Sequence, residues 1–175
     1  MMRKLSIAIA CFAVLALTAS AALATVYSGT INSANAPTGA HFAGGTSATC
    51  TTTGANVACS TYQVAGVGNA NASASLTASY TANVTCSNNG KNRNNDVESQ
   101  ATSFSTTSST GNLNPKNGKL TVPPVSTTAP TSPPAGSCPN GNWTAAFATG
   151  SPTLVSYSYT LTFAGFSGAW LTVTP

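Results

Sequence analysis

The feature that most constrains the fold is a 17-residue run, 70–86, in which small or apolar side chains alternate with Ser, Thr or Asn. A period of two places the two sets on opposite faces of a β-strand, so the run predicts a strand with one buried face. Leu76, Tyr80 and Val84 also have helical i, i+4, i+8 spacing, but Ser and Thr at alternate positions compete for backbone hydrogen bonds and disfavour a helix. The run is long for one strand, so a bend or bulge is expected near Ala74.

A second alternation covers residues 155–163 and places Tyr157, Tyr159, Leu161 and Phe163 on one face with Val155. Gly, Asn-Gly and Pro signals separate further strand-like segments. These predict strands at residues 26–31, 46–53, 56–64, 97–106, 119–125 and 166–173. About eight strands, with no amphipathic helix after the N-terminal segment, predict an all-β antiparallel β-sandwich of immunoglobulin-like or jelly-roll type.

Residues 1–24 have the order of a secretory signal peptide. Arg3 and Lys4 precede an uncharged apolar stretch, and residues 22–24 (Ala-Leu-Ala) fit the A-x-A cleavage rule, with residues 19–21 as an alternative cut. The apolar stretch is shorter than the ~20 residues that a membrane span needs. We therefore expect a signal helix that is removed on export, and a protein that is secreted or at the cell surface, in an extracellular or periplasmic compartment.

The cysteines fit this compartment. Cleavage removes Cys11, the residue that a lipoprotein would lipidate, and leaves four: Cys50, Cys59, Cys86 and Cys138. An even number in an exported chain indicates two disulfides rather than free thiols, and three pairings are possible. A hairpin turning at residues 54–56 would bring Cys50 and Cys59 face to face, which favours Cys50–Cys59 together with Cys86–Cys138.

Charge is scarce after residue 24. The four cations and two acids of residues 25–175 all lie between residues 91 and 119 and give a net charge of +2. So few dispersed cations are a poor supply for binding nucleic acid through its phosphates, and no nucleic-acid partner is expected. Six of the ten prolines lie in residues 123–139, which predicts a loop. The aromatic-rich segment after it needs packing partners from the N-terminal half, so residues 25–175 are expected to form a single domain.

The chemistry-bearing residues are few. His41 is the one histidine, and Asp96 and Glu98 are the two acids. A triad would have to combine His41 with one of these acids, and calcium needs more oxygen ligands than the acid pair supplies. We expect no catalytic residue, no metal site and no cofactor. Trp143 and Trp170 are the candidates for stacking on a sugar ring, which requires an exposed aromatic face.

Two short motifs suggest relatives. Residues 84–91 (Val-Thr-Cys-Ser-Asn-Asn-Gly-Lys) and residues 138–143 (Cys-Pro-Asn-Gly-Asn-Trp) resemble segments of small exported bacterial proteins of unknown function. The resemblance covers about the last 100 residues. It implies a β-sandwich with a Cys86–Cys138 bridge and brings no catalytic residues.

The sequence thus predicts a secreted, non-enzymatic protein of a surface layer or matrix, or a binding protein. Its expected partners are cell-surface polysaccharide or further copies of itself. A carbohydrate-binding accessory module is the first alternative. A small secreted hydrolase that uses His41 or the acids Asp96 and Glu98 is the second.

Overall fold

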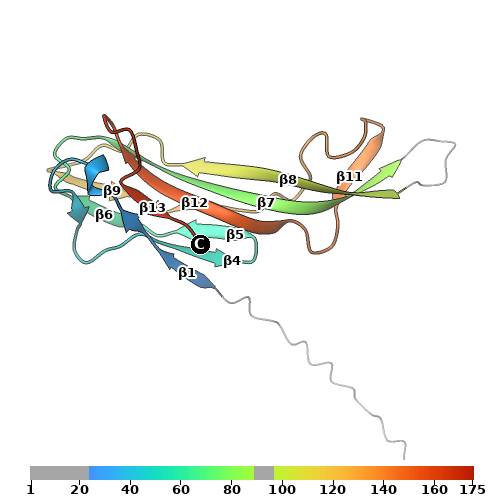
Figure 1. The fold of residues 1–175 in the computed structure, drawn as a ribbon, viewed down its shortest axis with the longest axis horizontal. Coiled ribbons are helices and arrows are strands. Elements are labelled where there is room, and N and C mark those ends of the chain that lie inside the picture. The colour runs from blue at the N-terminus through green and yellow to red at the C-terminus, as the bar shows by residue number, and fades with distance from the viewer. Residues whose placement is uncertain (1–23, 89–96) are drawn as a thin grey trace, which may run out of the picture.

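The computed structural model describes residues 24–88 and 97–175 (Figure 1). The predicted signal peptide and Asp96 therefore lie outside the described residues, apart from Ala24. The described chain contains thirteen β-strands and one 3-10 helix, η1 (Ser33–Asn35). No helix in these ranges is long and apolar enough to cross a membrane.

All strand pairs are antiparallel, which confirms the all-β antiparallel prediction. One sheet has the order β11-β7-β12-β13-β2, with β8 also on β7; the others are β1-β4-β5-β10 and β3-β6-β9. The strands are β1 (Thr25–Ser28), β2 (Thr30–Ile31), β3 (His41–Phe42), β4 (Thr49–Thr53), β5 (Asn56–Cys59), β6 (Tyr62–Ala65), β7 (Ala72–Asn88), β8 (Val97–Ser109), β9 (Lys119–Val122), β10 (Val125–Thr127), β11 (Trp143–Phe147), β12 (Thr153–Phe163) and β13 (Leu171–Val173).

The strands outnumber the expected eight because several predicted segments are broken and their parts join different sheets. The segment 26–31 breaks at Gly29, where an added Cβ would collide with the Leu171 side chain. The segment 56–64 breaks between β5 and β6. Part of the predicted loop 123–139 is strand β10, which pairs with β5 directly after Pro123-Pro124. The immunoglobulin-like or jelly-roll topology stays a prediction.

The long alternating run forms β7, as predicted. Its even positions from Ala72 to Cys86 are buried, and its odd positions are partly or fully exposed. A bulge near Ala74 is wrong, because the pairing of β7 with β12 is regular there; the alternative of a bend stays a prediction. The register shift lies in β12 between Leu154 and Ser156, so Val155 is the extra residue and its side chain is 60% exposed.

One hydrophobic cluster joins the sheets. It includes Ala36 near the N-terminal end of the described chain and Val173 near its C-terminal end. β10 contacts β7 and β8, and β5 contacts β12, so the shorter strands lie against the inner face of the long ones (Figure 1). Tyr62 and Tyr159 meet inside this cluster, with their hydroxyl oxygens 3.1 Å apart.

Both predicted disulfides are present. Cys50 and Cys59 are directly opposite each other on β4 and β5, with Cα atoms 4.0 Å apart. Cys86 at the far part of β7 is bonded to Cys138 in the proline-rich segment. The first bond links strands that the hairpin already pairs, whereas the second ties a long connection to the central strand.

We expect the Cys86–Cys138 bond to stabilise the fold more than Cys50–Cys59. Closing the longer loop restricts the unfolded chain more: about 3 kcal/mol for the separation of 9 residues and about 4 kcal/mol for that of 52. Urea unfolding of the two Ala-Ala double variants, each compared with the wild type, measures this order. A larger loss from Cys50→Ala with Cys59→Ala would contradict it.

The buried tyrosine pair predicts alkaline destabilisation. Burial, and then the neighbouring Tyr159, raise the pKa of Tyr62 above its ordinary value of 10.0, and burial raises the pKa of Tyr159. Because the folded state disfavours phenolate, the contribution to stability is full below pH 10 and is lost as the pH rises above it. The expected slope is up to about 1.4 kcal/mol per pH unit for each tyrosine.

Denaturant unfolding between pH 8 and 11 tests this expectation. The double variant Tyr62→Phe, Tyr159→Phe should lose less stability than the wild type over this range. A smaller slope should remain, since burial also raises the pKa of Tyr157 to about 12. The single variant Tyr159→Phe leaves the buried Tyr62 hydroxyl without its partner. At pH 7 it should therefore be less stable than the double variant. Equal slopes for wild type and double variant would refute the assignment.

Candidate binding surfaces

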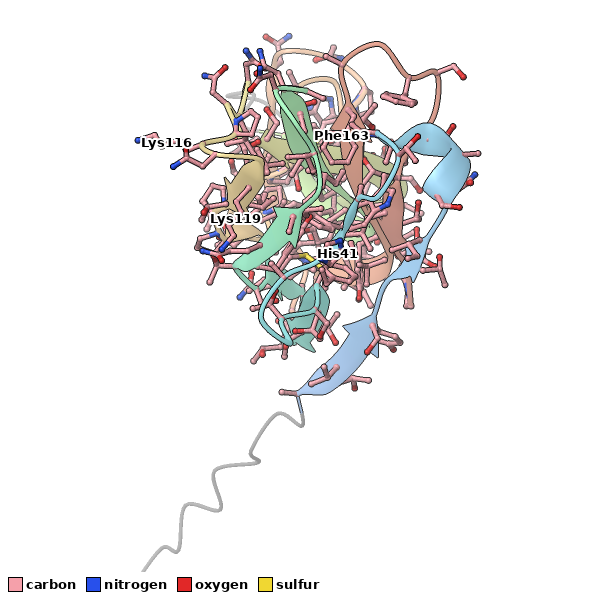
Figure 2. The ribbon with its side chains drawn as sticks, turned by 90° about the vertical axis from the view of Figure 1, so that its left-hand side faces the viewer. His41, Lys116, Lys119 and Phe163 are labelled. Carbon is pink, nitrogen blue, oxygen red and sulfur yellow. A yellow bond between two sulfur atoms is a disulfide. The ribbon has the colours of Figure 1, made fainter. Side chains whose placement is uncertain are left out.

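The charged residues described by the structure do not gather in a cleft. His41 on β3 is exposed, and its Nδ1 lies 2.7 Å from the Gly39 carbonyl oxygen. Through Ala65 it is in register with Lys119 of β9, so both lie on sheet β3-β6-β9, and Figure 2 shows them at one end of the molecule. Glu98 is on β8, opposite Cys86 in another sheet. Within residues 24–88 and 97–175, no three His, Cys, Asp or Glu side chains are grouped as metal ligands.

Trp170 is a core residue. Its side chain is fully buried, and its ring centroid lies 5.1 Å from that of Phe42 and 5.9 Å from that of Phe163. The ring has no face open to a ligand, so the predicted stacking role of Trp170 is wrong. The sequence signal missed this because no alternating pattern surrounds Trp170.

Trp143 is half-buried at the start of β11. It lines a hollow of about 480 Å³ together with Pro133 and Pro139 of the proline-rich segment and the following Asn140. Tyr157 and Tyr159, which the alternation places on one face of a strand, are buried. Of the two predicted stacking residues, Trp143 is therefore the one that keeps a partly accessible ring.

β8 presents a long strand edge. Of the described strands, it pairs with β7 only, and β10, which contacts it, is hydrogen-bonded to β5. The register with β7 is unbroken from Ser109 to Val97, so β8 has no bulge to twist its edge away. Residues 99–109 contain no charged side chain and no proline. Proteins commonly use bulges, lysines and prolines to protect an edge from pairing with another chain.

The face of the long sheet that points away from the core carries mainly hydroxyl groups. Ser and Thr occupy nearly every outward position on three neighbouring strands, namely alternate residues of 73–83 on β7, 103–109 on β8 and 156–162 on β12. Neighbouring hydroxyls interact across strands, as do Thr77 and Thr107 at 3.0 Å. None of these outward side chains is charged.

This outer face is hollowed where β12 leaves regular pairing with β7. Two adjoining hollows of about 350 and 210 Å³ share Thr81 and Ser103. Val155 borders the larger hollow, and Asn83 and Thr153 border the smaller. Together they form a groove, called the Val155 groove below, whose outward side chains are hydroxyl, amide or aliphatic. Tyr80 and Phe104, whose rings stack on each other, also border the larger hollow.

No protein-family model matches the chain, and no match is found among curated proteins or solved structures. The resemblance of the two cysteine motifs to small exported bacterial proteins therefore stays a prediction.

The two tryptophans should differ in solvent access. In the variant Trp143→Phe, the remaining fluorescence comes from the buried Trp170, and acrylamide should quench it weakly. In Trp170→Phe, provided that near-UV circular dichroism shows a folded protein, the half-buried Trp143 should be quenched several-fold more strongly. The placement of the two rings would be wrong if Trp170 proved the more easily quenched.

Proposed function

We propose that the chain is an exported, non-enzymatic protein of a surface layer or extracellular matrix that associates with further copies of itself through the edge of β8. In this proposal, the two larger sheets form a sandwich of immunoglobulin-like or jelly-roll type that carries the edge. The observation that supports it is the length of the edge together with its lack of protection: 13 residues in one strand, with no bulge in its pairing.

The physical reason is that an edge strand carries a row of backbone N–H and C=O groups that another strand can pair with. A second copy adding a strand there would satisfy these groups at regular spacing. The side chains of residues 99–109 are neutral, so two copies would meet without like-charge repulsion. Association should accordingly depend little on salt, unlike association through charged patches.

Two observations support the exported location. The Cys50–Cys59 and Cys86–Cys138 disulfides suit an oxidising compartment. The signal-peptide pattern of residues 1–24 directs a chain to such a compartment.

The two alternatives gain less support. For a module that stacks tryptophan on carbohydrate, Trp170 is buried in the core and Trp143 is the remaining candidate of the two. A hydrolase would need an acid to orient His41, whose hydrogen-bond partner in the structure is the Gly39 carbonyl. No observation on the described residues favours that reaction.

Lysines on the edge strand should block self-association. In the double variant Ser99→Lys, Thr107→Lys, both substituted side chains are exposed on β8, and pairing of two β8 strands brings the added charges of the two copies together. We expect the wild type to form oligomers with rising concentration. The double variant should need a protein concentration at least about tenfold higher than the wild type for the same degree of association. Sedimentation velocity over a concentration series measures this.

The matched control is Ser73→Lys, Thr81→Lys. It adds the same charge, at the same spacing of eight residues, to exposed positions on the same sheet, but on β7, whose two edges are paired with β8 and β12. It should associate like the wild type. A wild type that stays monomeric at high concentration, or a control that dissociates as much as the β8 variant, would refute the proposal.

A further inference from the structure

The Val155 groove has the features of a binding site on a different surface from the β8 edge. It lies on the outer face of the sheet, above β7 and between β8 and β12, whereas the proposed self-association uses backbone groups at the edge of β8. The two hollows adjoin at Thr81 and Ser103, a directly opposite pair on β7 and β8 that borders both. The groove therefore runs along the strands instead of forming a single isolated pit.

The local sequence explains why the face is hollow here. The bulge at Val155 shifts the register of β12, so Leu154 lies opposite Tyr80 and Ser156 lies opposite Ser79. On the other side, small side chains such as Ala101 and Ser103 of β8 leave space above the sheet. Val155 itself is 60% exposed at the border of the groove.

We infer that the Val155 groove binds a neutral polysaccharide chain. Its hydroxyl groups and the Asn83 amide both donate and accept hydrogen bonds, as the hydroxyls of a sugar do. The aliphatic Val155 offers an apolar contact for the C–H face of a sugar ring. A polymer carrying phosphate, sulfate or carboxylate groups would give up hydration of its charges without meeting a cation, because the described lining holds none.

The twist of the sheet favours one flexible chain over a flat crystalline surface. Neighbouring strands rotate by roughly 20–25° relative to one another, so a broad planar ligand could touch only part of the outer face. A single chain lying in the groove along β7 needs contact with three strands only. The ligand class is therefore an individual neutral glycan chain, soluble or projecting from a wall or fibre.

The test introduces a negative charge into the groove without touching the core. Val155→Asp changes an exposed side chain, and Val26→Asp is a matched control, because Val26 on β1 is also a 60% exposed valine and does not border the groove. Asn83→Asp is a second variant that changes charge with almost no change in shape. Retention of the full mature chain is measured on cellulose, chitin, starch and dextran, with polygalacturonate as an anionic comparison.

We expect retention on at least one neutral polysaccharide, weakened about tenfold or more by Val155→Asp and by Asn83→Asp and unchanged by Val26→Asp. Retention on none of the neutral polymers, retention only on polygalacturonate, or equal behaviour of the two valine variants would overturn the inference. Loss of binding in Trp143→Ala, with Val155→Asp unaffected, would overturn it too and place the sugar at Trp143.

Sedimentation of the same samples separates this inference from the proposed function. A monomeric wild type that binds a neutral polysaccharide and loses it in Val155→Asp would support the groove and refute self-association. Oligomers that bind no neutral polysaccharide would support self-association and refute glycan binding in the groove.

Discussion

The pairing of both edges of β7 is the constraint on which the rest of the structure depends. One edge is covered by β8 along almost the whole strand, and the other by β12 and then by β11. Every other long strand takes its position from β7. The Cys86–Cys138 bond attaches the proline-rich segment to the same strand, so this irregular connection is held against the longest strand of the sheet.

The inner face of β7 explains how the layers fit. Alanines at positions 72, 74, 78 and 82 leave room beside Leu76, Tyr80 and Val84 for large rings from other strands. Tyr159 of β12 meets Tyr62 of β6, and Phe104 of β8 stacks on Tyr80 at 5.5 Å between ring centroids. A face on which small residues alternate with a few large ones packs densely against rings from the other strands.

The sequence predicted those parts of the fold that depend on local pattern. Alternation over residues 70–86 fixes which side of β7 is buried, and the cysteines bracketing residues 54–56 indicate the hairpin and its disulfide. Prediction from the sequence failed where contacts between residues far apart in the chain determine the structure. β11 has no signal in its own residues and exists because β7 offers an edge there. The bulge at Val155 depends on how β12 meets β7, and the burial of Trp170 depends on Phe42, which is far away in the chain.

The candidate surfaces follow from one compositional choice, which the sequence did show: hydroxyl and amide groups replace charges as the means of solvation. Three charged side chains are described, and Lys116 and Lys119 lie together at one end (Figure 2). A neutral sheet surface has no lysine to protect a strand edge, so solvation by hydroxyl groups leaves β8 open to pairing.

The same neutrality decides which ligand can lie on the outer face, because hydroxyl groups hydrogen-bond to a sugar as readily as to water but offer nothing to balance an ion. The proposed self-association at the edge and the proposed glycan binding on the face thus rest on the same solvation chemistry. They are compatible, because one uses backbone groups and the other uses side chains that stand perpendicular to them. An array of copies joined through β8 would set several grooves side by side, and a polymer spanning them would bind more tightly than one groove could hold it.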